Sequence, residues 1–130
     1  MTPNRLPVRV YWEDTDAGGV VYHASYLRFM ERGRTEFLRG RGVVQSTLQA
    51  DSGITFVVAE MKIRFRAPAK LDDELTVDTT MIEGRGASMV LAQTITRGTE
   101  VLVEADVTCA AISREGRPVR LPAELKARLG

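Results

Sequence analysis

Apolar side chains recur at helical spacing between residues 25 and 39, and this is the clearest pattern in the chain. The positions that share one face of such a helix are Tyr26, Phe29, Met30, Gly33, Phe37 and Leu38. Most of the remaining positions are arginine or glutamate, so the pattern predicts a helix with one broad apolar face. Gly40 and Gly42 are expected to end it.

Gly33 lies in the centre of that face, although glycine costs roughly 1 kcal/mol in a helix interior. We therefore expect Gly33 to mark a place where the helix packs closely on a sheet. Weaker patterns predict a short helical turn over residues 43–50 and a short terminal helix over residues 122–129.

The hydrophobic period changes to two after residue 53, which is typical of strands with one buried face. The positions predicted to face inward are Ala59, Met61, Ile63 and Phe65, then Leu75, Val77, Thr79 and Met81, then Val101, Val103, Ala105, Val107, Cys109 and Ala111. Residues 87–97 read as a further strand, and residues 5–12 as an earlier one that precedes the helix. Turn residues separate the later strands, so antiparallel hairpins are expected.

One helix and one sheet, each with a single apolar face, must cover each other. The order of elements therefore predicts an α+β fold, a curved antiparallel sheet wrapped around one long central helix, in a single domain spanning residues 1–130. Other apolar side chains are predicted to point away from the inward set: Val58, Ile82, Val90, Leu102 and Ile112. Because a monomer would leave them near water, they favour self-association.

Composition narrows the class of protein. The hydrophobic fraction is 44%, the charged fraction is 27% and the net charge is +1, so the basic excess of a nucleic-acid-binding protein is missing. The single cysteine, Cys109, cannot form an intramolecular disulfide and is expected to be a small buried hydrophobe. The sequence shows neither a signal peptide nor a transmembrane run, and a cytoplasmic location is expected.

The candidate chemistry is concentrated between the first strand and the helix. Residues 11–26 hold Glu13, Asp14 and Asp16, the Gly18-Gly19 pair and the only histidine, His23. The start of a helix offers unpaired N–H donors and partial positive charge, which suit a developing oxyanion. A carboxylate beside such a site can attack an activated acyl group or activate water to attack it.

Other chemistries fit this segment less well. A calcium loop would need acidic or amide side chains where Gly18 and Ser25 stand. One histidine and one distant cysteine are a poor zinc-ligand set, and no serine lies in a nucleophile-elbow sequence. From the residues alone, the alternative stays open that Asp14 and Asp16 are solvated turn residues and that His23 is a capping or packing residue.

Residues 8–29 resemble the active-site segment of the hotdog-fold acyl-CoA thioesterases. The chain is similar to the 4-hydroxybenzoyl-CoA thioesterase family, and most of all to its Tol–Pal-associated acyl-CoA thioesterase branch. The likeness continues through residues 34–36 and the strands between residues 58 and 78, and so covers most of the chain. One departure is Ser25, where that branch usually has asparagine.

The resemblance implies the hydrolysis of an acyl-CoA to a free carboxylic acid and CoA. It implies that Asp16 is the nucleophile or general base, and that the N–H groups near His23 polarise the thioester carbonyl while the His23 side chain orients substrate or water. Gly18 and Gly19 would let the thioester approach the backbone, and Tyr22 and Ser25 would contact the substrate. It implies neither a metal nor a redox cofactor.

The resemblance also implies a homo-oligomer, a dimer or a tetramer built from dimers, with active sites between subunits. Exposed cations are candidates to bind the phosphates of CoA: Arg64, Arg66, Lys70, Arg85, Arg114 and Arg117. Two alternatives remain, an acyl-carrier-protein thioesterase and a non-catalytic interaction module. The module would associate peripherally with envelope or lipid-synthesis proteins.

Overall fold

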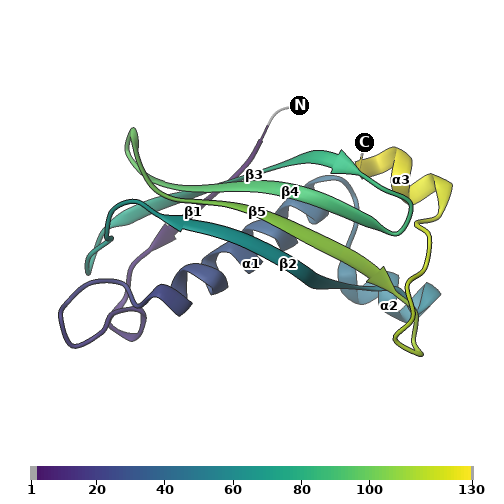
Figure 1. The fold of residues 1–130 in the computed structure, drawn as a ribbon, viewed down its shortest axis with the longest axis horizontal. Coiled ribbons are helices and arrows are strands. Elements are labelled where there is room, and N and C mark those ends of the chain that lie inside the picture. The colour runs from purple at the N-terminus through teal and green to yellow at the C-terminus, as the bar shows by residue number, and fades with distance from the viewer. Residues whose placement is uncertain (1–2, 130) are drawn as a thin grey trace.

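The computed structural model describes residues 3–129 and shows a curved five-stranded antiparallel sheet, in the order β1-β3-β4-β5-β2, with the long helix α1 against its concave side (Figure 1). The elements are β1 (Asn4–Arg9), the 3-10 turn η1 (Trp12–Asp14), α1 (His23–Gly40), α2 (Gln45–Ser52), β2 (Thr55–Phe65), β3 (Glu74–Gly84), β4 (Ser88–Arg97), β5 (Glu100–Ile112) and α3 (Ala123–Leu129). The predicted α+β architecture is confirmed. Within the described residues, every helix is too short or too polar to cross a membrane.

The apolar face of α1 is the predicted one. Tyr26, Phe29, Met30, Phe37 and Leu38 are all buried against the sheet. A Cβ atom added to Gly33 would lie 2.7 Å from Cγ1 of Val77 in β3. The close approach of helix and sheet at Gly33 is therefore confirmed.

Both ends of the connection into α1 differ from the prediction. β1 ends at Arg9, and Trp12 belongs to η1 rather than to a strand, because the chain turns there to begin the loop. The helix begins at His23, two residues before the predicted start at Ser25, with Tyr22 in the N-cap position. The helix N-terminus therefore lies directly after the Gly18-Gly19 loop.

The inward alternation holds in the central strands, where Leu75, Val77, Val103, Val107 and Cys109 are buried. Burial also raises the pKa of the Cys109 thiol. In β2, Met61 and Ile63 pack against the core as predicted, but the alternation breaks at Ala59, because a register shift between Val58 and Glu60 inserts it as an extra residue.

This bulge corrects the predicted orientation of Val58, which pairs with Cys109 and so shares the helix-facing side of the sheet. Ala59 is exposed rather than inward. Phe65 pairs with Val103 and so lies on the helix-facing side as predicted, although it stays 48% exposed at the end of the strand. Two of the predicted outward side chains, Val90 and Leu102, are buried, whereas Ile82 is 57% exposed as expected. A second register shift lies between Ile95 and Thr96, opposite the start of β5.

The segment between β2 and β3, residues 66–73, is not the turn of a hairpin. β2 pairs with β5 and β3 pairs with β1, so this connector carries the chain from one edge of the sheet towards the other. It passes the start of α1, where the Ala69 amide donates to the Tyr26 hydroxyl at 2.9 Å. The connector therefore links the sheet to the beginning of the helix.

Candidate active site

Residues 15–22 form a narrow loop, here called the active-site loop, that leads into α1. A bridge joins Thr15 to Val21, and the Asp16 amide donates to the Val20 carbonyl at 2.9 Å. Gly19 adopts a positive φ of 80° at the loop tip, a conformation that favours glycine. Figure 1 shows this loop extending past the start of α1, where it reaches solvent.

Asp16 lies on this loop with an exposed side chain. Its Oδ1 atom accepts a hydrogen bond of 2.8 Å from the Gly18 amide, which fixes the direction of the carboxylate. Because this bond uses one oxygen of an exposed group, the carboxylate is both oriented and accessible. These are the properties that a nucleophile or general base requires.

Asp14 has a different environment, although it is only two residues away. Its side chain is 5% exposed, its Oδ2 accepts from the Tyr11 amide at 2.8 Å, and its Oδ1 accepts from Arg28 at 3.2 Å. The Asp14 carboxylate therefore closes the η1 turn and ties it to α1. The alternative of a solvated turn residue is wrong for Asp14.

His23 is the first residue of α1, and Tyr22 before it makes no side-chain capping bond. The Tyr22 amide donates to the Asp14 carbonyl and the Ser25 amide donates to the Tyr22 carbonyl. The amides of His23 and Ala24 have no acceptor within the helix, so these two can donate to a ligand. The exposed His23 ring lies 4.5 Å from the Tyr22 ring and 6.3 Å from the Phe65 ring, centroid to centroid. The imidazole thus belongs to an aromatic surface beside the helix start.

Ser25 differs from the other predicted site residues. It is 2% exposed, and its hydroxyl accepts a hydrogen bond from Arg28 at 3.0 Å. It is the third helical residue and not the helix cap, because α1 begins at His23. The structure thus places Asp16, Gly18, Gly19 and Tyr22 on one exposed loop, with His23 directly after it as the first residue of α1. Ser25 is buried in the first turn of the helix.

Phe65, the last residue of β2, was not among the predicted site residues. In the fold its ring lies 5.7 Å from Tyr26 as well as close to His23, and it is 48% exposed. Burial raises the pKa of Tyr26, whose hydroxyl accepts from the Ala69 amide. This contact depends on the strand order, so no local pattern could have revealed it.

The predicted cations separate into two groups. The backbone of Lys70 forms a β-bridge with Val20 of the active-site loop. Arg64 and Arg66 flank Phe65 in the sequence. Arg85 follows the end of β3, at the opposite end of the sheet, and Arg114 donates to Gln49 and Ala50 of α2. Arg117 follows β5 at that same distant end. Of the six, Lys70 is the one whose backbone pairs with the active-site loop, whereas Arg66 pairs with Glu104 of β5 at 2.9 Å.

Among residues 3–129, His, Cys, Asp and Glu side chains form no group of three or more that could hold a metal ion. The loop and the helix start offer an accessible carboxylate, unpaired amides and an aromatic rim. These features together match a site for attack on a carbonyl group.

A model of the thioesterase-like superfamily matches residues 10–129, from the end of β1 to α3. The chain belongs to this superfamily. It is 48% identical over 123 residues to the acyl-CoA thioesterase YbgC of Haemophilus influenzae. That alignment covers 94% of this chain and 90% of that protein. It is 46% identical to the acyl-CoA thioester hydrolase YbgC of Escherichia coli, over 95% of this chain and 92% of that protein.

Solved structures of thioesterase-like proteins confirm the hotdog fold. A probable thioesterase from Bartonella henselae superposes with a TM-score of 0.89 at 44% identity, over 92% of this chain and 99% of that one. A 4-hydroxybenzoyl CoA thioesterase in complex with 4-hydroxybenzoyl CoA superposes over the full length of both chains with a TM-score of 0.92. Because the two sequences are only 20% identical, this second similarity supports the fold alone.

Proposed function

We propose that this protein hydrolyses an acyl-CoA thioester to a free carboxylic acid and CoA, with Asp16 as the reacting group. The proposal is carried by the Asp16 carboxylate, which is exposed, oriented by Gly18 and placed on the loop that enters the α1 N-terminus. The YbgC proteins, which are acyl-CoA thioesterases by name, support the substrate class because they match nearly the whole chain.

Two reaction routes use the same carboxylate. As a nucleophile, Asp16 bonds to the thioester carbon, the C–S bond breaks, CoA leaves as the thiolate, and water then hydrolyses the mixed anhydride. As a general base, Asp16 takes a proton from water while the water oxygen attacks the same carbon, and CoA again leaves. Mass spectrometry of an acid-quenched single turnover separates the routes, because only the first adds the acyl mass to the peptide containing Asp16.

The remaining loop residues have supporting roles in this proposal. The amides at the start of α1, near His23, donate to the carbonyl oxygen and stabilise the negative charge that develops on it. The His23 side chain orients substrate or water, and Tyr22 contributes to the aromatic wall beside it. Gly18 and Gly19 keep the loop free of side chains, so the thioester can reach the backbone.

A panel of acyl-CoA thioesters, assayed for thiol release with the purified protein, tests this function and identifies the acyl group. Failure to release CoA from aliphatic and aromatic members alike would contradict it. Comparing turnover of one acyl group on CoA and on acyl-carrier protein separates the two thioesterase alternatives. Turnover that is lost on changing Asp16 argues against a non-catalytic module that associates with envelope or lipid-synthesis proteins.

The assembly proposed for this function is a homodimer, or a tetramer built from dimers. β2 is an edge strand that pairs only with β5, and it exposes Val57, Val58 and Phe65. An edge strand of this kind can pair with the same strand of a second copy, which would also cover Phe65 beside the active site. We expect sedimentation at micromolar concentration to show a multiple of 14.4 kDa. A fully active species of that single mass would refute the assembly.

Nucleotide recognition is expected to depend on the cations near the active-site loop. Changing Lys70→Gln should raise KM for acyl-CoA several-fold and reduce its increase with salt, because phosphate contacts are charge-assisted and screened by ions. KM for a short thioester without the nucleotide should change little. Arg85→Gln, at the opposite end of the sheet, is the matched control. Equal responses of the two variants would count against Lys70.

A further inference from the structure

The connector, residues 66–73, supports both ends of the segment that carries the active-site loop. On one side, the Val10 amide donates to the Asp73 carbonyl at 2.9 Å and the Asp72 amide donates to the Val10 carbonyl at 3.0 Å. On the other side, the Val21 amide donates to the Ala69 carbonyl at 2.9 Å. Any shift of the connector would therefore move both the entry and the exit of the chain around Asp16.

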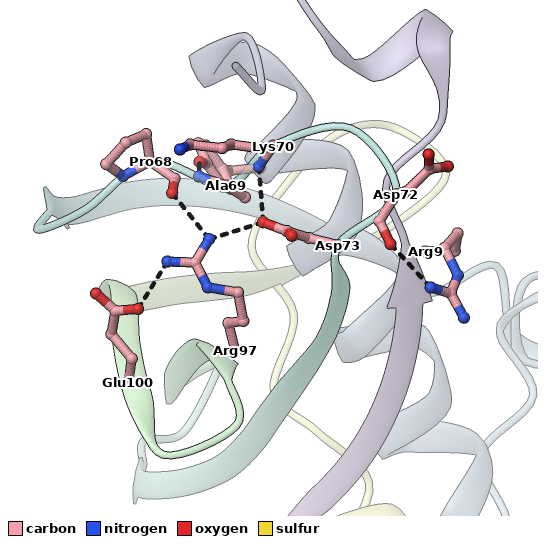
Figure 2. A network of polar contacts seen from close by, with 9 residues as sticks. Arg9, Pro68, Ala69, Lys70, Asp72, Asp73, Arg97 and Glu100 are labelled. Atoms are coloured by element: carbon pink, nitrogen blue, oxygen red, sulfur yellow. Dashed lines mark hydrogen bonds and ion pairs between the residues drawn. The ribbon is translucent and has the colours of Figure 1, made fainter. Parts of the chain in front are cut away.

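Two guanidinium groups hold the connector in turn (Figure 2). Arg9 donates to the Asp72 carbonyl at 2.8 Å, and Arg97, at the end of β4, makes two contacts with the connector. The Arg97 group is the one that spans the connector from end to end. Its Nη1 atom donates to the Asp73 carboxylate at 2.7 Å and to the Pro68 carbonyl at 3.3 Å. The same Asp73 oxygen accepts from the Lys70 amide at 2.8 Å, which closes the connector on itself. The Nη2 atom donates to Glu100 at 2.6 Å, which fixes Arg97 in the turn before β5.

The Arg97–Asp73 pair is more enclosed than an ordinary surface ion pair. Its side chains are 32% and 23% exposed, compared with 54% and 37% for the Arg39–Glu36 pair on α1. Burial acts to raise the pKa of Asp73, but hydrogen bonds from the Lys70 amide and Arg97 outweigh it and lower that pKa. Asp73 is thus ionised at neutral pH, and a charge-assisted bond at partial burial constrains geometry better than an exposed pair does.

We infer that Arg97 is a positioning residue for thioester hydrolysis. By joining Pro68 to Asp73 it keeps the connector in one shape, and the connector keeps Asp16 and the start of α1 at a fixed separation. Arg97 acts indirectly, through the backbone hydrogen bonds that join the connector to Val10 and Val21. The inference rests on the proposed function, because it assigns consequences to the place of Asp16.

Replacing Arg97 by glutamine should lower kcat by about 10- to 100-fold, because small displacements of a reacting group are costly. KM should change less than threefold. Arg97→Lys should recover part of the loss, since an ammonium can reach Asp73 but lacks the planar fork that serves three acceptors. Arg39→Gln, which removes an ion pair on α1, should retain activity within twofold of the unchanged protein.

Amide hydrogen exchange gives a readout that does not depend on turnover. Exchange at Val10 and Val21, which bond to the connector, should accelerate at least tenfold in Arg97→Gln and stay unchanged in Arg39→Gln. If the unchanged protein hydrolyses no thioester, the proposed function is wrong. The exchange data would still test whether Arg97 holds the connector in place.

Two results would overturn the inference: a kcat for Arg97→Gln within threefold of the unchanged protein, or a fall in kcat without faster exchange at Val21. If Arg97→Gln does not fold, Asp73→Asn replaces it, because asparagine can still accept from the Lys70 amide while the ion pair is lost. The same thresholds for kcat and for Val21 exchange then apply.

Discussion

Replacing Asp16 by asparagine is expected to lower kcat by about 10³-fold or more, with a smaller change in KM. The amide oxygen of asparagine can still accept from the Gly18 amide, so the loop keeps its shape. What is lost is the anionic oxygen that attacks or takes a proton. Loss of a general base alone costs roughly 10²- to 10⁴-fold, and the effect falls on kcat because the group acts in the transition state.

Steady-state kinetics on purified, assembled variants measure this effect. Glu13→Gln is the matched control, because Glu13 is an exposed acid in the neighbouring turn and should retain nearly full kcat. His23→Ala should cost less than Asp16→Asn, since the backbone amide survives. Asp14→Asn is unsuitable as a control because Asp14 holds the turn together. If the kcat of Asp16→Asn stays within tenfold of that of the unchanged protein, Asp16 is not the reacting group and another acid must be tested.

Replacing Gly33 by valine is expected to destabilise the fold by roughly 3 kcal/mol or more. A Cβ atom there would lie 2.7 Å from Cγ1 of Val77 and 3.0 Å from Nε2 of Gln93. Neither neighbour can move freely, because Val77 is fully buried and the Gln93 amide donates to the Met30 carbonyl at 2.9 Å. The additional methyl groups of valine would increase the overlap, so the helix would have to move away from β3.

The control is valine at Gly40, the last residue of α1, where an added Cβ would meet only Asn4 Oδ1 at 3.8 Å. Denaturant unfolding of both variants should show a change within about 0.5 kcal/mol at Gly40, as for other surface substitutions. A Tm drop of roughly ten degrees is expected for Gly33→Val alone. Equal stability of the two variants would show that the helix packs less closely on the sheet.

The elements set by local pattern were predictable. The apolar face of α1 and the alternation in β3 and β5 follow from spacing along one segment, and so does the close approach at Gly33. The five predicted site residues Asp16, Gly18, Gly19, Tyr22 and His23 all lie within residues 16–23, so their proximity was also evident before the fold was known.

Local patterns could not predict the features that depend on pairing between distant segments. Ala59 reads as one more alternating residue, and only the pairing of β2 with β5 shows the bulge that turns Val58 towards the helix. Asp14 looks like a turn acid until Arg28 is placed beside it. The bond from Arg97 to Asp73 likewise joins the end of β4 to the connector, two segments that no sequence pattern links.

The order of strands also sets the order in which the molecule can fold. β3, β4 and β5 follow one another in the chain and pair with their immediate neighbours, so they close only short loops. β1 and β2 pair with strands that come later in the chain, and their loops are long and entropically costly to close. We therefore expect the meander of β3, β4 and β5 to form first, and β1 and β2 to dock onto its two edges. Because the active-site loop follows β1 and its connector follows β2, the site takes its shape only when both edges are in place.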